Sequence, residues 1–209
     1  GMTPDEARGL LRNGVTGPQS MSGSKATADG TTTFVAGPNG TEQTLPWTFI
    51  RNVNPNEPNP LFARESFVCV CAEVPIDAES PEDFVEKATE FSNEKLWGTL
   101  ACSMSIPNGF RKDEKRRQLL QNKIDELRFG AVSINQWSAI VFALMSPPWG
   151  GCSGGTLEDP LSGIGWVHNS FMLTDIDKTV LEAPLNVLPK PVWSPNHHRP
   201  EEVSWALFD

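Results

Sequence analysis

Residues 66–135 alternate between short apolar runs and amphipathic segments, and this alternation restricts the fold more than any other feature of the chain. Strands are expected at "SFVCVCAEV" (66–74), "GTLACSMSI" (98–106) and "AVSIN" (131–135). Helices are expected at 80–93 and from about 113 to 129. This order is typical of right-handed crossover connections in a parallel sheet. The chain is therefore predicted to be an α/β protein with a mostly parallel sheet sandwiched by helices.

The first strand and the first helix of this series carry the clearest local signals. Residues 66–74 are apolar at nearly every position, so this strand is expected to be covered on both faces. The helix should begin at the N-cap Ser80 with Pro81 in its first turn. Its inward face is predicted from helical spacing to hold Phe84, Ala88 and Phe91.

The second helix should point Leu120, Ile124 and Leu127 inward and end before Gly130. The only basic cluster, "RKDEKRR" (111–117), lies at its start and includes acids, which favours a solvated helix face. The net charge of −9 also argues against a nucleic-acid partner, because phosphate contacts need clustered Lys and Arg.

Three segments of different character are expected along the chain. Residues 1–30 should form a short helix (3–12) and a flexible linker, and 31–185 the α/β domain. That domain should open with a hairpin turning at Asn39-Gly40, whose second strand Pro46 would place at a sheet edge. "NVNPNEPNP" (52–60) should be an extended loop, and 186–209 an irregular tail.

Cysteine usage and hydropathy bear on location. The longest apolar run, 139–145, is too short to span a bilayer, and the first thirty residues contain no secretory signal, so no membrane partner is expected. The four cysteines lack the spacing of a secreted disulfide framework, which favours a cytoplasmic location. Cys69, Cys71 and Cys102 are interpreted as buried strand thiols, so neither a metal site nor a disulfide is predicted.

No complete catalytic constellation is visible in the residue pattern. His168 has no serine elbow or aspartate partner that would suggest a triad, and no glycine-rich phosphate motif follows a predicted strand. The most constrained stretch runs from the strand end at Asn135, whose side chain should bond the following loop, to "PPWGG" (147–151). This stretch either lines a site at the carboxyl end of the sheet or simply closes the core.

Six short motifs, in order, resemble the carboxyl-terminal part of the catalytic domain of the NAD(P)-dependent aldehyde dehydrogenase superfamily. "ESFVC" resembles E-x-F-G-P without the Gly-Pro, and "SNEKLWGTLACSM" resembles N-x-x-x-Y-G-L-x-A with Trp97 for Tyr. "GAVSIN" resembles a strand that ends in V-N, "PPWGG" resembles P-F-G-G, and "LSGIG" with "DKTV" resembles S-G-x-G and the late K-x-V. The resemblance covers roughly residues 61–182.

The resemblance implies an aldehyde dehydrogenase-like α/β fold and the reaction in which NAD or NADP oxidises an aldehyde to an acid or acyl product. It implies that Glu65 holds the nicotinamide ribose and that Phe67 lies beside the nicotinamide. It makes Trp149 an aldehyde-pocket residue, and it suggests that Gln136 and Trp137 face the same tunnel.

The departures from the family are equally specific. The family's nucleophile lies in G-Q-x-C and its general base in E-L-G-G, and neither motif occurs in this chain. Cys152 follows "PPWGG", where the family has no nucleophile, so no catalytic residue is assigned. The chain is expected to be inactive alone, without binding NAD or NADP, and to act with a complementary aldehyde dehydrogenase subunit. The alternative is a non-catalytic module that forms homodimers or docks on a full-length homologue.

Overall fold

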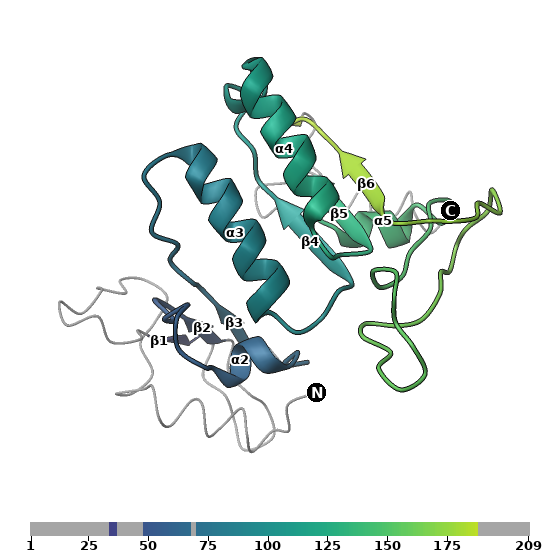
Figure 1. Cartoon of the computed structure of the whole chain (residues 1–209), viewed down its shortest axis with the longest axis horizontal. Helices are drawn as coiled ribbons and strands as arrows, with labels where there is room; N and C mark the ends of the chain where they lie inside the picture. Colours follow the sequence, from purple (N-terminus) through teal and green to yellow (C-terminus); the bar gives the residue numbers. More distant parts are fainter. Residues whose placement is uncertain (1–33, 37–47, 68–69, 188–209) are drawn as a thin grey trace, which may run out of the picture. The chain divides into compact units, whose positions relative to one another are not determined.

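A computed structural model describes residues 34–36, 48–67 and 70–187 (Figure 1). The described residues form two compact units, each with its own three-stranded sheet. The first unit contains the described residues up to Thr99 together with 118–128 and 156–162. The second unit contains 100–117, 129–155 and the described residues from Gly163 onward. Several predictions fall outside the described residues. These are the helix at 3–12, the Asn39-Gly40 turn, Cys69 and the predicted tail beyond its first two residues.

The sheet of the first unit has the order β1-β2-β3. β1 (Phe34–Ala36) pairs antiparallel with β2 (Thr48–Ile50), which pairs parallel with β3 (Val70–Ala72). The predicted antiparallel pairing is thus confirmed. The expectation that Pro46 would keep the second strand at an edge is wrong, because β2 is the central strand and its paired residues begin at Thr48, after the proline.

A small apolar core supports this first sheet. Ile50, Val53 and Phe62 are its buried members. Phe62 belongs to the short helix α2 (Pro60–Ala63), which Asn59 caps by accepting a hydrogen bond from the Leu61 N–H. The Phe62 ring meets the Phe91 ring edge-on at 5.2 Å between centroids, so α2 is fixed to α3 by an aromatic contact.

β3 differs from its predicted counterpart in length and in burial. Among the described residues of the expected range 66–74, which exclude 68 and 69, a strand is assigned at Val70–Ala72. Cys71 is exposed, so the predictions of a strand covered on both faces and of a buried thiol at this position are wrong. Val70 and Ala72 are half-buried, so side chains that alternate along the strand leave the face of Cys71 in solvent.

Helix α3 (Pro81–Lys95) begins as predicted, because the Ser80 hydroxyl oxygen accepts a hydrogen bond from the Asp83 N–H. Its predicted inward face is confirmed in part, because Phe91 packs against the core around Phe62 and Ala88 is half-buried. Phe84 is exposed, and Val85 and Thr89 are buried instead. Helical spacing fits either face, and packing favours the one that carries the smaller β-branched residues.

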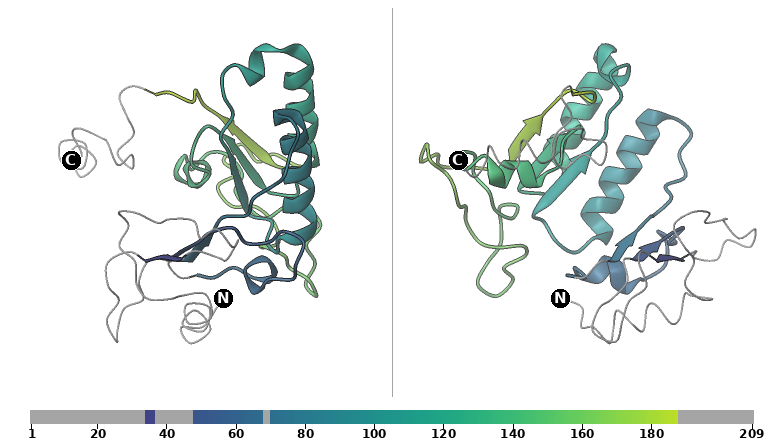
Figure 2. Two further views of the ribbon diagram at one scale, coloured as in Figure 1. Left: turned by 90° about the vertical axis from the view of Figure 1, so that its left-hand side faces the viewer. Right: turned by 180° about the vertical axis from the view of Figure 1, so that it is seen from behind.

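The sheet of the second unit has the order β4-β5-β6 and is parallel throughout (Figure 2). It consists of β4 (Ala101–Met104), β5 (Ala131–Ile134) and β6 (Thr179–Glu182). All four residues of β5 are buried, as expected for a central parallel strand. Three of the four described strand pairings are parallel, so the α/β class is confirmed. The strands expected in one sheet are divided between two, because β3 pairs in the first sheet whereas β4 and β5 pair in the second.

Helix α4 (Glu114–Glu126) precedes β5 and buries Leu120, Ile124 and Leu127 at its inward positions, which confirms the predicted face. The predicted stop at Gly130 is wrong. The side chain of Asn93 ends the helix instead, because its Nδ2 donates to the Glu126 carbonyl at 2.9 Å and its Oδ1 accepts from the Arg128 N–H at 2.8 Å. A 3₁₀ turn (Phe110–Lys112) precedes α4, and α5 (Ala139–Ala143) follows β5.

Candidate functional site

Three glycines bring distant loops of the second unit into backbone contact. A Cβ on Gly130 would collide with the Gly150 carbonyl oxygen and would lie 2.8 Å from the carbonyl carbon of Gly151. A Cβ on Gly150 would in turn collide with the Gly165 carbonyl oxygen and would lie 3.2 Å from the Trp166 ring. Only glycine permits this approach, so the loops at 150–151 and 165 are fixed against the start of β5.

Hydrogen bonds connect the same loops. Trp149 and Val167 form an antiparallel bridge, with N–H to carbonyl distances of 3.0 and 2.9 Å. Thr179, the first residue of β6, donates its hydroxyl to the Pro148 carbonyl at 2.7 Å and its N–H to the Gly130 carbonyl at 2.8 Å. Together with the glycines, these bonds make a junction, which we call the glycine junction, among residues 130, 147–151, 165–167 and 179.

Asn135 organises the other end of β5. It has a positive φ of 59°, a conformation in which Asn is tolerated far better than bulky residues. Its Oδ1 accepts a hydrogen bond of 2.6 Å from the Ile106 N–H, and its own N–H donates to the Met104 carbonyl. The side chain therefore binds the loop that follows β4 and not, as predicted, the loop that follows Asn135 itself.

The three residues predicted to line an aldehyde tunnel lie at opposite ends of β5. Gln136 and Trp137 follow Asn135 at the carboxyl end of β5, where Gln136 is half-buried and Trp137 is 57% exposed. Trp149 belongs to the glycine junction at the amino end. The four residues of β5 separate the ends by about 13 Å, given a rise of about 3.3 Å per residue.

Trp149 takes part in an aromatic cluster with two residues that the sequence did not suggest. The Phe142 ring of α5 meets the Trp149 ring at 5.8 Å and the His168 ring at 4.5 Å between centroids. His168 has a positive φ of 65°, and its buried Nδ1 has no hydrogen-bond partner among the described residues. The three rings form one mostly apolar contact group that contains a single imidazole.

Glu65 and Phe67 belong to the first unit and follow α2 directly. Both side chains are exposed, Phe67 by 73%, and Phe67 has a positive φ of 50°. An exposed carboxylate can accept hydrogen bonds from a ribose diol, and an exposed ring can lie against a flat heterocycle.

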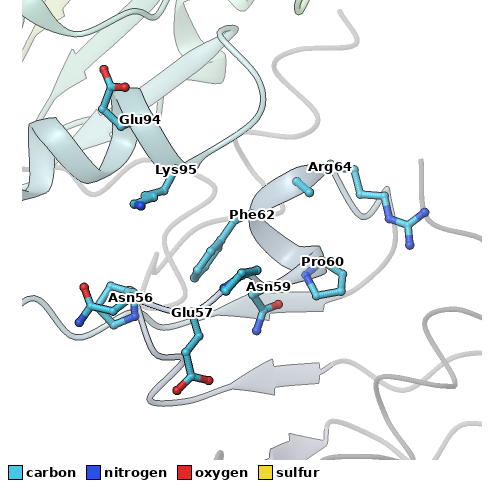
Figure 3. A pocket seen from close by; sticks show the side chains of 11 residues that line it. Asn56, Glu57, Asn59, Pro60, Phe62, Arg64, Glu94 and Lys95 are labelled. Atoms are coloured by element: carbon cyan, nitrogen blue, oxygen red, sulfur yellow. The ribbon is translucent and has the colours of Figure 1, made fainter.

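A cavity of about 780 Å³ lies next to these residues along the chain (Figure 3). The loop 55–60 forms one side. The cavity is also lined by Phe62 of α2, by Arg64 directly after α2, and by Glu94 and Lys95 at the end of α3. Its lining mixes prolines with two acids and two bases. The sequence predicts only an extended loop here, and the prolines at 55, 58 and 60 are the one signal in it of a rigid cavity wall.

Among the described residues, the side chains whose pKa is shifted do not form a catalytic group. The pKa of Asp83 is lowered by the hydrogen bond from Lys87, whose own pKa is raised by the same bond, and this pair lies one turn apart on the surface of α3. Cys152 is half-buried after the glycine junction. Within the described ranges, no group of three His, Cys, Asp or Glu side chains could hold a metal ion.

Burial raises the pKa of the half-buried Cys102 thiol from 9.0 to about 11. Between these two pKa values the folded protein retains a proton that the unfolded chain releases. The contribution of this thiol to the free energy of unfolding is therefore complete below pH 9 and is lost as the pH rises through about 11. At pH 8 we expect iodoacetamide to modify Cys102 about 100-fold more slowly in the folded protein than in urea. Mass spectrometry of the digest gives both rates, and equal rates would contradict the burial of this thiol.

Comparison with protein-family models, with curated proteins and with solved structures finds no match to the chain. Among the described helices, none has both the length and the apolar composition needed to cross a membrane.

Proposed function

We propose that the chain is a partial aldehyde dehydrogenase-like protein, whose first unit carries residues for the nicotinamide riboside and whose second unit carries a wall of an aldehyde pocket. The glycine junction is the observation that carries this proposal. Four segments that resemble the family, "GAVSIN", "PPWGG", "LSGIG" and "DKTV", contribute Gly130, Gly150, Gly165 and Thr179 to one set of backbone contacts. Their contact in one place supports reading the four segments as parts of one arrangement.

The proposed roles follow from the resemblance to the family, and the exposure of Glu65 and Phe67 is compatible with them. Glu65 would accept hydrogen bonds from the ribose of NAD or NADP, and Phe67 would lie against the nicotinamide. Trp149, held by Phe142 and by its bridge to Val167, would form the apolar wall of the aldehyde pocket. The bound dinucleotide supplies hydride acceptance, and the residues of this chain supply position and exclude water.

The nucleophile and the general base of the family reaction would come from a complementary polypeptide, since G-Q-x-C and E-L-G-G do not occur in this sequence. The isolated chain is therefore expected to form no NADH with aldehydes and to show no micromolar NAD binding by calorimetry.

Association is the first test. The chain should bind a polypeptide that carries the amino-terminal two-thirds of a family member, including both motifs, and sedimentation should detect a one-to-one complex. Phe84→Glu, on the exposed side of α3, should bind equally and serves as the control. A mixture that sediments as two separate species would count against the proposal.

A second candidate function is a non-catalytic module that forms homodimers. It is favoured by the large apolar side chains that the second unit exposes, and it predicts self-association without any gain of activity on mixing.

A further inference from the structure

Two cavities of the first unit adjoin and form one open groove, which we call the charged groove. The cavity beside α2 has a volume of about 780 Å³, and its neighbour along α3 has a volume of about 800 Å³. They share four lining residues, Pro55, Asn56, Glu94 and Lys95, and every residue that lines either cavity belongs to the first unit. Each volume falls within the range of ligand pockets, which is about 300–1,000 Å³.

One face of α3 forms a wall of the charged groove. The helix contributes Lys87, Glu90, Phe91, Glu94 and Lys95. Because residues three and four apart are neighbours on a helix surface, these five lie on one side of α3. They span about 12 Å along the helix axis, at a rise of about 1.5 Å per residue. A peptide in an extended conformation rises about 3.3 Å per residue, so this wall alone accommodates about four peptide residues.

The opposite wall consists of the two loops 55–60 and 75–77. These loops contribute four prolines to the lining, and the fixed φ of proline limits the motion of the wall. Asn54 closes the turn at the start of the first loop. Its Oδ1 accepts a hydrogen bond from the Asn56 N–H at 2.9 Å, and its Nδ2 donates to the Glu57 carboxylate at 2.8 Å. This wall is therefore rigid.

Hydrogen bonds also connect the two walls. Lys87 donates from its Nζ to the Asp77 carbonyl at 3.0 Å and joins the loop 75–77 to α3. The Trp97 N–H donates to the Phe62 carbonyl at 2.7 Å and joins the end of α3 to α2. The charged groove is therefore formed before a ligand arrives, which reduces the entropy lost on binding.

Two charged side chains of opposite sign are available to a ligand on the α3 wall. Neither Lys95 nor Glu90 has a hydrogen bond or an ion pair within the part of the chain that the structure describes. The other charges of this wall are already used, since Glu94 pairs with Arg128 at 3.1 Å and Lys87 pairs with an acid of α3 at 2.8 Å. The groove therefore offers one ammonium group and one carboxylate.

Apolar side chains lie between these charges. Figure 3 shows the Phe62 ring between Lys95 and Asn59, whereas Glu94 and Arg64 are directed away from it. Phe91 and Ile76, which are half-buried, supply the apolar surface of the neighbouring cavity. A ligand that places an apolar group on this surface removes both apolar areas from water, which favours binding.

We propose that the charged groove binds a short extended peptide segment of another protein. An acidic side chain of the peptide pairs with Lys95, a basic side chain pairs with Glu90, and an apolar side chain between them contacts Phe62 and Phe91. Glu90 and Lys95 differ in height by about 7.5 Å along α3, so the two charged peptide residues are about two or three positions apart.

A peptide fits the open form of the groove better than a compact ligand does. Sites for small molecules bury about 70–90% of the ligand surface. Here Lys95, Glu90, Asn56 and Pro58 are all exposed along the rim, so a bound chain can enter and leave at the ends of the groove. The proposal uses neither Glu65 nor any residue of the second unit, and it does not depend on a nucleotide or an aldehyde.

The first test selects peptides of about seven residues from a random displayed library on the immobilised full chain. The selected sequences should share an acidic and a basic residue about two or three positions apart, with an apolar residue between them. A selection that enriches no shared pattern would overturn the proposal.

Charge reversal then locates the site of the most enriched peptide, with fluorescence anisotropy of the labelled peptide as the measurement. Lys95→Glu and Glu90→Lys should each raise the dissociation constant about tenfold, since each replaces an attraction by a repulsion. Lys115→Glu on α4 and Glu86→Lys on α3 are the matched controls, because both residues are exposed and neither lines the groove. Equal effects of a groove variant and its control would overturn the proposal.

A reversed peptide separates loss of charge complementarity from loss of structure. A peptide whose acidic residue is replaced by lysine should bind Lys95→Glu more tightly than it binds the wild type. Raising the ionic strength should weaken the wild-type complex, because salt screens exposed ion pairs. Self-association of the wild type that Lys95→Glu abolishes would identify a second copy of the chain as the occupant and would overturn the proposal.

Discussion

Replacing Gly130 by alanine should lower the free energy of unfolding by about 3 kcal/mol, at the upper end of the usual cost of overpacking. The new methyl group would collide with the Gly150 carbonyl oxygen and would lie 2.8 Å from the Gly151 carbonyl carbon. Backbone atoms cannot move aside as a flexible side chain can. Gly150 is also closely packed against the Gly165 carbonyl oxygen. The loop at 150–151 could therefore not move away from the new methyl group without disturbing the whole glycine junction.

Gly109→Ala is the matched control. Gly109 has a φ of −65° and no atom within 4 Å of an added Cβ, so alanine should change the stability by less than about 1 kcal/mol. Urea unfolding of both variants, followed by tryptophan fluorescence, measures the difference. Equal midpoints for the two variants would show that the loops do not meet at Gly130.

The strands and helices between residues 66 and 135 could be predicted from sequence because each carries a local signal. Ser80 capped the helix where expected, and Leu120 and Ile124 were buried at helical spacing. Structural features that depend on residues far away in the sequence could not be predicted. Asn93 ends α4 from another helix, and no pattern in 113–130 points to it.

β6 was missed for a related reason. Its four residues, Thr179–Glu182, alternate in burial but are too few to separate from the irregular chain around them. They become a strand because β5 offers a parallel partner, with Ala131 opposite Thr179. Tertiary pairing decides such short strands more than local propensity does.

The candidate site was predictable in part. The glycines of "GAVSIN" and "PPWGG" suggested a constrained loop, and the structure shows that their constraint is mutual contact. Phe142 and His168 had no signal, since a phenylalanine in an apolar run and a lone histidine are ordinary residues. Their contact with each other and with Trp149 depends on α5 and on the loop at 167–170, which only the fold brings together.

The largest effect expected of this protein is the appearance of an activity that neither component has alone. On the proposed function, a complementary polypeptide with the G-Q-x-C and E-L-G-G motifs would carry the thiol and the base. This chain would supply Glu65 and Phe67 from its first unit and Trp149 from its second. Proximity in an assembled site is worth several orders of magnitude in rate. NADH formation should therefore rise from background to a measurable turnover on mixing.

Glu65→Gln separates the proposed cofactor role from simple assembly. Loss of the charged acceptor should raise the NAD concentration for half-maximal rate about tenfold, because a hydrogen bond to a charged group contributes about 1.5–3 kcal/mol. Glu86→Gln, an exposed acid on α3, should leave that concentration unchanged. An identical response of the two variants would remove Glu65 from the site.

The most direct measurement of the central proposal is the initial rate of NADH formation from a panel of aldehydes by the equimolar mixture, set against each polypeptide alone. The proposal predicts no rate for either component and a rate for the mixture that increases with the amount of this chain until the two are equimolar. A mixture that stays at background while sedimentation shows a one-to-one complex would contradict it.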